Sequence, residues 1–457
     1  MFAFLLLVMV ASRRIKGPLW ALCIAWLICL APIVSGAVIY RYVVDAGHSY
    51  SITLIVFIGM FVLGYAFFEA VRRPHPVPPT PTLQDFQRSC TNVYPVALAC
   101  WWLAMIATAF NYIDFTLLGG AGLDDLAALR DSYANKRATS AFAQIASILT
   151  WACLFCYMFA LFFRRELSRW RFAMFLIPIV GYFSLSVFSA GRQAAFQIVL
   201  VSVLLVIVTG IVRPSPRLDV DRTPQRWLTR ERLGIAAISA AMIGYMGYVA
   251  VARNDGNISD DKSQLLMIIF EFQFAPVVER ITQAMGSGLR GAIVEGVVYF
   301  SSSPALFEPF LTIHWPQYYF GAMTFPLFLR QIEPLTGLSV TAGLTAKVDA
   351  INAIGVLGSG WATSMSSYLI DFGFAGTLVF LFAMGVYSAF AWRVMLRTRN
   401  FYAVVIGILV LINAIYMPLT PGVSDSNLVL LWLFCLVMKG RSYRLLLPMR
   451  QRLPAPR

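Results

Sequence analysis

Charged side chains that stand alone between apolar runs are the residues of this chain that could do chemistry. Arg192, in Ser189-Ala-Gly-Arg-Gln193, is the single charged residue between positions 172 and 212. Arg253 follows another apolar run, in Val251-Ala-Arg-Asn-Asp255. A guanidinium keeps its charge and pairs bidentately with phosphate oxygens, so both arginines indicate an anion site at a membrane boundary. For Arg192, a simple topological anchor is the alternative.

One acid stands out in a late apolar run. Asp371 lies in Tyr368-Leu-Ile-Asp-Phe-Gly-Phe-Ala-Gly376, about one helical turn inside the predicted membrane face. An acidic side chain at that depth is costly unless it is paired or faces a wet cavity, so it is a functional candidate. Gly373 and Gly376 lie one helical turn apart and are expected to allow close helix packing.

The membrane face that carries these residues is predicted to hold further charged side chains. Those that could act together with them are Arg130, Arg290, Asp255, Glu271 and Glu279. Carboxylates could serve as bases, and arginines could contact phosphate. For each arginine, a structural salt bridge with an acid of the same face is an open alternative.

The elements that must position these residues are membrane helices. The chain has 457 residues, 59% of them hydrophobic and 13% charged, and its mean hydropathy is +0.73. Soluble proteins contain about 25% charged residues, so a water-soluble enzyme and a disordered chain are excluded. Runs of about 20 apolar residues cross a bilayer as helices. Eleven spans are predicted, at residues 1–11, 18–40, 51–70, 93–113, 139–163, 172–190, 193–212, 233–252, 366–390, 401–418 and 427–438.

The distribution of basic residues orients these spans. The short loops on one side, together with the tail from Lys439, carry 25 of the 36 Lys and Arg. Because basic residues accumulate on the cytoplasmic side, we expect the N-terminus outside and the C-terminus in the cytoplasm. The net charge of +14 is thus spread over membrane loops and does not indicate a nucleic-acid partner.

One long external segment, 253–365, separates the eighth and ninth spans. It is predicted to hold amphipathic helices on the outer membrane surface, for example over Gln264–Met285, where apolar residues recur at helical spacing. The whole chain, 1–457, is expected to form a single polytopic membrane domain with an all-α fold.

Metal and redox chemistry have little support in the sequence. The chain has 3 histidines, and the orientation places His75 on the opposite side from His48 and His314. A histidine-based metal centre is therefore not expected, and no nucleotide-binding motif is present. The 7 cysteines fall within or beside apolar runs, which predicts buried thiols without disulfides. We expect neither a metal nor a cofactor.

Four sequence elements follow one another in an order that resembles a known family. They are Ser189–Arg192 at an outer hairpin, Arg253 after the next span pair, Phe320-Gly-Ala-Met-Thr-Phe325 in the long external segment, and Tyr368–Gly376 opening a late span. Over roughly residues 90–440, this order resembles the Wzy-type O-antigen, or oligosaccharide repeat-unit, polymerases of bacteria. The resemblance implies a glycosyltransferase of the GT-C type in the bacterial inner membrane, with its active site facing the periplasm.

The resemblance also implies a reaction and its partners. A growing glycan would pass from undecaprenyl diphosphate to a sugar hydroxyl of a second lipid-linked repeat unit. Arg192 and Arg253, assisted by Arg130 or Arg290, would stabilise the developing charge of the diphosphate without a metal. The base is left open among Asp255, Glu271, Glu279 and Asp371. The implied partners are undecaprenyl-diphosphate-linked oligosaccharides, membrane lipid and a protein that regulates chain length.

Two other enzyme or transport functions are alternatives. The related O-antigen ligases carry a histidine shortly before the late acidic element, whereas here the nearest one, His314, lies 57 residues before Asp371. This difference favours a polymerase. A flippase or exporter of lipid-linked oligosaccharides would need polar residues along several spans, and most spans here are apolar.

A purely structural scaffold is a third alternative. It would not explain external arginines that oppose the positive-inside trend.

Overall fold

The structure is mostly helical over the residues that it describes. A computed structural model describes residues 2–12, 17–71, 83–114, 140–188, 193–213, 266–268, 270–285, 287–305, 307, 311, 321, 324–325, 364–419 and 425–450. Five of its segments are apolar helices long enough to cross a membrane: Ile52–Val71, Gln84–Ile113, Ala141–Phe162, Gln193–Val212 and Ser364–Thr398. The protein is therefore an α-helical, multi-pass membrane protein.

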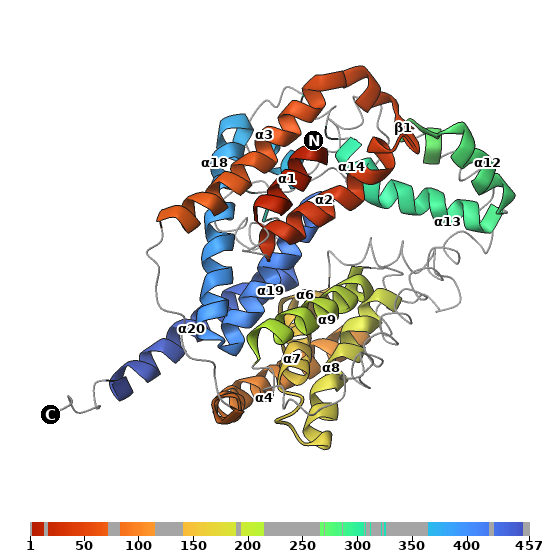
Figure 1. Ribbon diagram of the computed structural model, residues 1–457. Helices are drawn as coiled ribbons and strands as arrows, with labels where there is room; N and C mark the ends of the chain where they lie inside the picture. Colours follow the sequence, from red (N-terminus) through yellow and green to blue (C-terminus); the bar gives the residue numbers. More distant parts are fainter. Residues whose placement is uncertain are drawn as a thin grey trace, which may run out of the picture. The chain divides into compact units, whose positions relative to one another are not determined.

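Ten of the eleven predicted spans coincide with helices (Figure 1). These helices are α1 (Phe2–Ala11), α2 (Pro18–Val34), α3 (Arg41–Val71), α4 (Leu83–Ile113), α6 (Ala141–Leu149), α7 (Trp151–Phe162), α8 (Arg169–Phe188), α9 (Gln193–Val212), α18 (Ser364–Thr398), α19 (Phe401–Tyr416) and α20 (Ser426–Arg450). The span predicted at 233–252 lies outside the described residues. The total of eleven therefore stays a prediction.

The boundaries of the early helices differ from the predicted ones. α3 begins at Arg41 and α4 at Leu83, each about ten residues before the span predicted there. α2 ends at Val34 because Ser35 and Gly36 turn the chain, with Gly36 in the left-handed region at φ 70°. An apolar run marks only the part of a helix that faces lipid, so polar helical extensions are not visible in it.

A short β-ribbon interrupts the otherwise helical fold. β1 (Val38–Tyr40) pairs antiparallel with β2 (Phe272–Phe274), in the register Val38 with Phe274 and Tyr40 with Phe272. The hydroxyls of Tyr40 and Ser301 are 2.8 Å apart, and burial raises the pKa of the Tyr40 phenol above its usual value. The all-α prediction is correct except for this ribbon, and the predicted span 18–40 ends too late.

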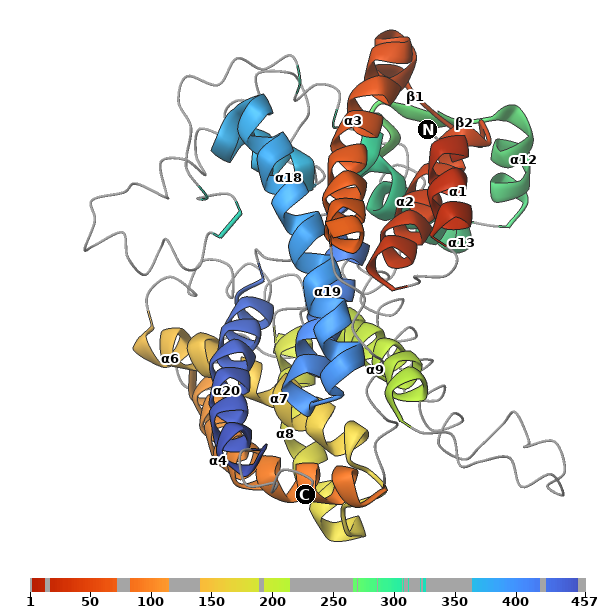
Figure 2. The same cartoon turned by 60° about the vertical axis from the view of Figure 1, so that its left-hand side comes forward.

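The helix predicted over Gln264–Met285 is wrong in its extent. In the described part of this run, α12 (Pro276–Ala284) is the longest helix, because β2 takes up Phe272–Phe274 and a proline then opens the helix. α13 (Ser287–Val297), the π-helical stretch η2 (Val298–Ser302) and α14 (Ser303–Ala305) follow. Figure 2 shows the β1–β2 ribbon next to α12. Val277 and Ile281 on one face of α12, and Met285 directly after the helix, are exposed apolar residues.

The chain forms two compact units. Unit 1 comprises Met1–Pro74, Ala250–Trp392 and Val410–Asp425, and unit 2 comprises the remaining residues. The core of unit 1 is built from large apolar side chains of α2, α3 and α18, among them Trp26, Phe61 and Tyr368.

Glycines set the crossing of α3 and α18 inside unit 1. A Cβ atom added at Gly64 would lie 2.1 Å from the carbonyl oxygen of Phe382, and one at Gly385 would lie 2.1 Å from that of Phe61. Close backbone approach of membrane helices depends on such small residues. The packing glycines of α18 therefore include Gly385, which the sequence reasoning did not single out.

The core of unit 2 surrounds α7. Eleven of the twelve residues of α7 are buried, against α4, α8, α9 and α20. The Ser140 side chain caps the preceding α6 by accepting hydrogen bonds from the backbone N–H groups of Phe142 and Ala143. All seven cysteines of the chain are free and buried, as the sequence predicted.

Candidate functional site

Asp371 is fully buried in α18 and is held by a residue of segment 253–365, which is predicted to be external. Its Oδ2 accepts a hydrogen bond from the backbone N–H of Thr324, at 2.7 Å, and another from the Thr324 hydroxyl, at 2.6 Å. The exposed fraction of Asp371 is 0%. Two donors on one oxygen offset much of the cost of burying a carboxylate. The contact joins the segments Phe320–Phe325 and Tyr368–Gly376, for which the sequence resemblance gave only their order along the chain.

Thr324 was not given a role by sequence reasoning. The sequence contained one indication of such a role, because Thr324 is the one hydroxyl-bearing residue of Phe320-Gly-Ala-Met-Thr-Phe325. Nothing in the spacing indicated that it faces Asp371, since the two residues are 47 positions apart.

A break in α18 lies directly after Asp371. Gly373 has φ 66° and ψ −177°, a conformation open essentially to glycine alone. The Thr377 hydroxyl donates to the Gly373 carbonyl oxygen at 2.7 Å. A Cβ atom at Gly376 would lie 2.7 Å from the Cβ of Phe372 in the same helix. Gly373, for which close helix packing was predicted, bends α18, and the buried acid lies two residues before that bend.

The N-terminal end of α18 is fixed to the end of α19. The backbone N–H of Ser364 donates to the carbonyl oxygen of Met417 at 3.2 Å, and the Ser364 hydroxyl donates to the same oxygen at 2.5 Å. Across the break, the rings of Phe372 and Phe380 stack with centroids 5.1 Å apart. Both halves of α18 are therefore anchored around Asp371, and this rigidity is what a binding or catalytic carboxylate requires.

Glu271 lies at the β-ribbon, where its carboxylate pairs with the basic side chain of Arg41. Its carboxylate is 3.5 Å from a terminal nitrogen of Arg41, and its backbone carbonyl accepts from the Arg41 N–H at 3.0 Å. Glu271 has φ 44°, a left-handed conformation at the turn into β2. These contacts give Glu271 a role in holding the two strands together.

Arg290 forms a salt bridge with Glu279. Its terminal nitrogen is 2.6 Å from Glu279 Oε1, which also accepts from the Gln283 amide at 2.8 Å. The Arg290 side chain is 10% exposed. The sequence left two roles open for Arg290, phosphate ligand or structural ion pair. In the structure, Arg290 forms an ion pair that links α13 to α12.

Four predicted site residues are outside the part of the chain that the structure describes: Arg130, Arg192, Arg253 and Asp255. Arg192 immediately precedes α9, which starts at Gln193. Of the predicted site residues that the structure describes, Arg290 and Glu279 pair with each other, Glu271 pairs with Arg41, and Asp371 accepts hydrogen bonds from Thr324.

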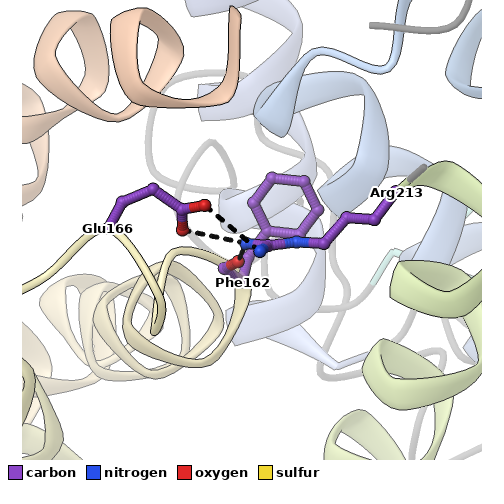
Figure 3. A network of polar contacts seen from close by, with 3 residues as sticks. All are labelled: Phe162, Glu166 and Arg213. Atoms are coloured by element: carbon purple, nitrogen blue, oxygen red, sulfur yellow. Dashed lines mark hydrogen bonds and ion pairs between the residues drawn. The ribbon is translucent and has the colours of Figure 1, made fainter. Parts of the chain in front are cut away.

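A second polar network lies in unit 2, and sequence reasoning did not foresee it (Figure 3). Arg213, at the end of α9, contacts both oxygens of Glu166 at 3.2 and 3.0 Å and also donates to the carbonyl oxygen of Phe162. Its guanidinium carbon lies 5.1 Å from the centre of the Phe86 ring. The ion pair is nearly buried, which marks it as a structural link between α9 and the turn after α7.

These contacts join segments that the charge pattern assigns to the same side of the membrane. Glu166 and Arg213 both belong to predicted cytoplasmic loops, and Arg41 and Glu271 both belong to predicted external segments. A set of three or more His, Cys, Asp or Glu side chains that could hold a metal is absent from the described part of the chain.

Comparison of the chain with protein-family models, with curated proteins and with solved structures gave no match in any of the three.

Proposed function

We propose that this chain is a membrane glycosyltransferase that polymerises lipid-linked oligosaccharide repeat units, of the Wzy type, on the periplasmic face of the bacterial inner membrane. The observation that supports this proposal best is the contact of Asp371 with Thr324. It brings together two of the motifs on which the resemblance depends, and Asp371 is a buried acid near the N-terminal end of a membrane helix.

The reaction that we propose needs a base and a charge stabiliser. The hydroxyl of the acceptor sugar attacks the anomeric carbon of the donor glycan, and a new carbon–oxygen bond forms. The bond to the diphosphate breaks, and undecaprenyl diphosphate leaves with the electron pair. The proton of the hydroxyl passes to a carboxylate.

Asp371 is the base that we propose among the four carboxylate candidates. Glu271 and Glu279 are engaged with Arg41 and Arg290, so each would have to release an arginine before accepting a proton. Asp371 is fully buried, and its Oδ2 accepts hydrogen bonds from the N–H and the hydroxyl of Thr324. These two donors are neutral, so they can hold the carboxyl group in either protonation state. Asp255 lies outside the described residues.

Arginines would stabilise the leaving diphosphate. Arg192 and Arg253 remain the first candidates for this role, with Arg130 as a further one, because their fixed donor geometry suits phosphate oxygens. Arg290 would contribute only if substrate displaced Glu279, since the two are paired. The proposal therefore assigns Arg290 a positioning role in the external segment. No step of this scheme requires a metal or a cofactor.

The partners that we propose are undecaprenyl-diphosphate-linked oligosaccharides, the lipid around the helices and a protein that regulates chain length. The test is made in the protein's own host. Deletion of the gene is expected to leave surface glycan as single repeat units, seen on gels and by mass spectrometry, and the intact gene to restore the polymer ladder.

Two variants connect this test with the site. Asp371→Asn keeps an oxygen that can accept both Thr324 hydrogen bonds but cannot take up the proton, so the ladder should not return. Arg192→Ala should fail in the same way. Expression at normal level is checked by immunoblot. Long lipid-linked polymer that accumulates in the deletion strain would indicate a ligase, and single units on the cytoplasmic leaflet would indicate a flippase. An unchanged glycan profile would contradict all three functions.

A further inference from the structure

The turn between α7 and α8 carries a cluster of arginines that the proposed function does not use. Arg164, Arg165, Arg169 and Arg171 lie within eight residues, and all four are exposed. Trp170, in the first turn of α8, is 87% exposed. All five residues belong to unit 2.

The one acid of this turn does not neutralise the cluster. The Glu166 side chain is 3% exposed, and both of its oxygens are bound by Arg213 of α9 (Figure 3). Within the described part of the chain, none of the four exposed arginines forms an ion pair with a carboxylate. The surface of the turn is therefore purely cationic, although the sequence places an acid in its middle.

Aromatic rings fix two of the four guanidinium groups. The guanidinium carbon of Arg164 lies 5.5 Å from the centre of the Phe172 ring, and that of Arg171 lies 5.1 Å from the centre of the Tyr94 ring. Such cation–π contacts restrict the side chains before any ligand binds, which lowers the entropy lost on binding. The cluster is thus partly ordered in advance.

We infer that this cluster binds the headgroups of anionic phospholipids in the leaflet on its own side of the membrane. Guanidinium groups pair with the phosphate oxygens of a lipid headgroup. An exposed tryptophan at the end of a membrane helix favours the interfacial layer, where its ring meets acyl chains and its N–H meets polar groups. The two preferences place the arginines and Trp170 at the same depth. This inference is independent of the proposed enzymatic reaction.

The experiment measures lipid binding by the purified full-length protein. In detergent, the protein is titrated with phosphatidylglycerol or phosphatidylcholine, and bound lipid is counted by native mass spectrometry. The wild type should prefer phosphatidylglycerol. The double variant R164Q/R169Q should lower that affinity about thirtyfold, because each basic residue near an anionic surface contributes about 1 kcal/mol. Both positions are exposed, so the fold should be unchanged, which gel filtration checks.

A matched control removes the same charge elsewhere in unit 2. The variant R397Q/R399Q changes two arginines around the α18–α19 connection and should keep wild-type affinity within about twofold. An equal loss in both double variants would show that net charge alone attracts lipid, and wild-type binding by R164Q/R169Q would show that the cluster is not the site. Displacement of the lipid by inorganic phosphate at equal concentration would indicate a site for the free anion. Each of these three results would overturn the inference.

Discussion

Asp371 is the residue on which the proposed site depends, because a carboxylate buried in an apolar helix needs hydrogen-bond donors directed at it. Thr324 supplies two of them, one from its backbone and one from its side chain. A threonine can therefore position the acid and hold the external segment against α18 at the same time.

Removal of the Thr324 hydroxyl should weaken this contact without abolishing it. Thr324→Val keeps the shape and the backbone N–H donor but leaves Asp371 Oδ2 with one donor fewer. We expect the free energy of unfolding to fall by about 1.5–3 kcal/mol, as for hydrogen bonds to charged groups. Thermal unfolding followed by gel filtration measures the loss. Thr324→Ser keeps the hydroxyl and should stay close to wild type; an equal loss in both variants would contradict the role of the hydroxyl.

The Arg213–Glu166 pair should behave as a buried ion pair. Arg213→Met leaves the Glu166 carboxylate, which is 3% exposed, without its guanidinium partner. We expect a destabilisation of about 3–5 kcal/mol. The double variant Arg213→Met/Glu166→Gln removes both charges and should recover a large part of this loss, which the same unfolding assay measures. If the losses caused by Arg213→Met alone and by Glu166→Gln alone simply add up in the double variant, the two residues do not interact.

At the scale of elements, α18 is two helical segments joined at Gly373. The backbone there has φ 66° and ψ −177°, so an alanine would be strained by about 1–3 kcal/mol. Gly373→Ala should either lower stability by that amount or straighten α18 and shift Asp371. In both cases we expect the variant to restore the glycan ladder poorly in the deletion strain. Full restoration together with unchanged thermal stability would be evidence against a functional bend.

The crossing of α3 and α18 gives a second prediction for an element. Gly64→Ala places a methyl group against the carbonyl oxygen of Phe382, where the Cβ would lie at only 2.1 Å, so the helices must move apart. We expect a loss of about 1–3 kcal/mol, as in overpacked interiors. The control is Gly210→Ala in α9, where no atom lies within 4 Å of the added Cβ. That variant should be neutral or more stable by up to about 1 kcal/mol, and a comparable loss there would refute the packing explanation.

For the whole molecule, the predicted topology can be tested by labelling single cysteines. The native thiols are buried, so they give little background. Gln283→Cys and Ser168→Cys place exposed thiols at polar positions of segments predicted to lie on opposite sides of the membrane. In spheroplasts, a membrane-impermeant maleimide should label position 283 and not position 168, and permeabilisation should expose both. Labelling of position 168 in intact spheroplasts would contradict the charge-based orientation.

Sequence and structure agree best where the physics is local. A run of about 20 apolar residues must form a helix in lipid, because every backbone polar group has to find a partner within the segment. Ten predicted spans accordingly coincide with helices, and the cysteines are buried as expected. Polar ends of helices, such as residues 41–50 of α3, lack that constraint, and their helicity could not be predicted from apolar runs.

The membrane class was determined by the sequence itself. The sequence also marked Asp371 as a functional candidate, since burial of an acid in an apolar run is costly wherever the run packs. Its partner was decided only by the tertiary structure. Thr324 and Asp371 are 47 residues apart, Tyr40 and Ser301 are 261 apart, and the register of β1 with β2 follows no local signal. Which acid meets an arginine and which meets a threonine depends on how segments distant in the chain pack, and spacing along the sequence does not carry that information.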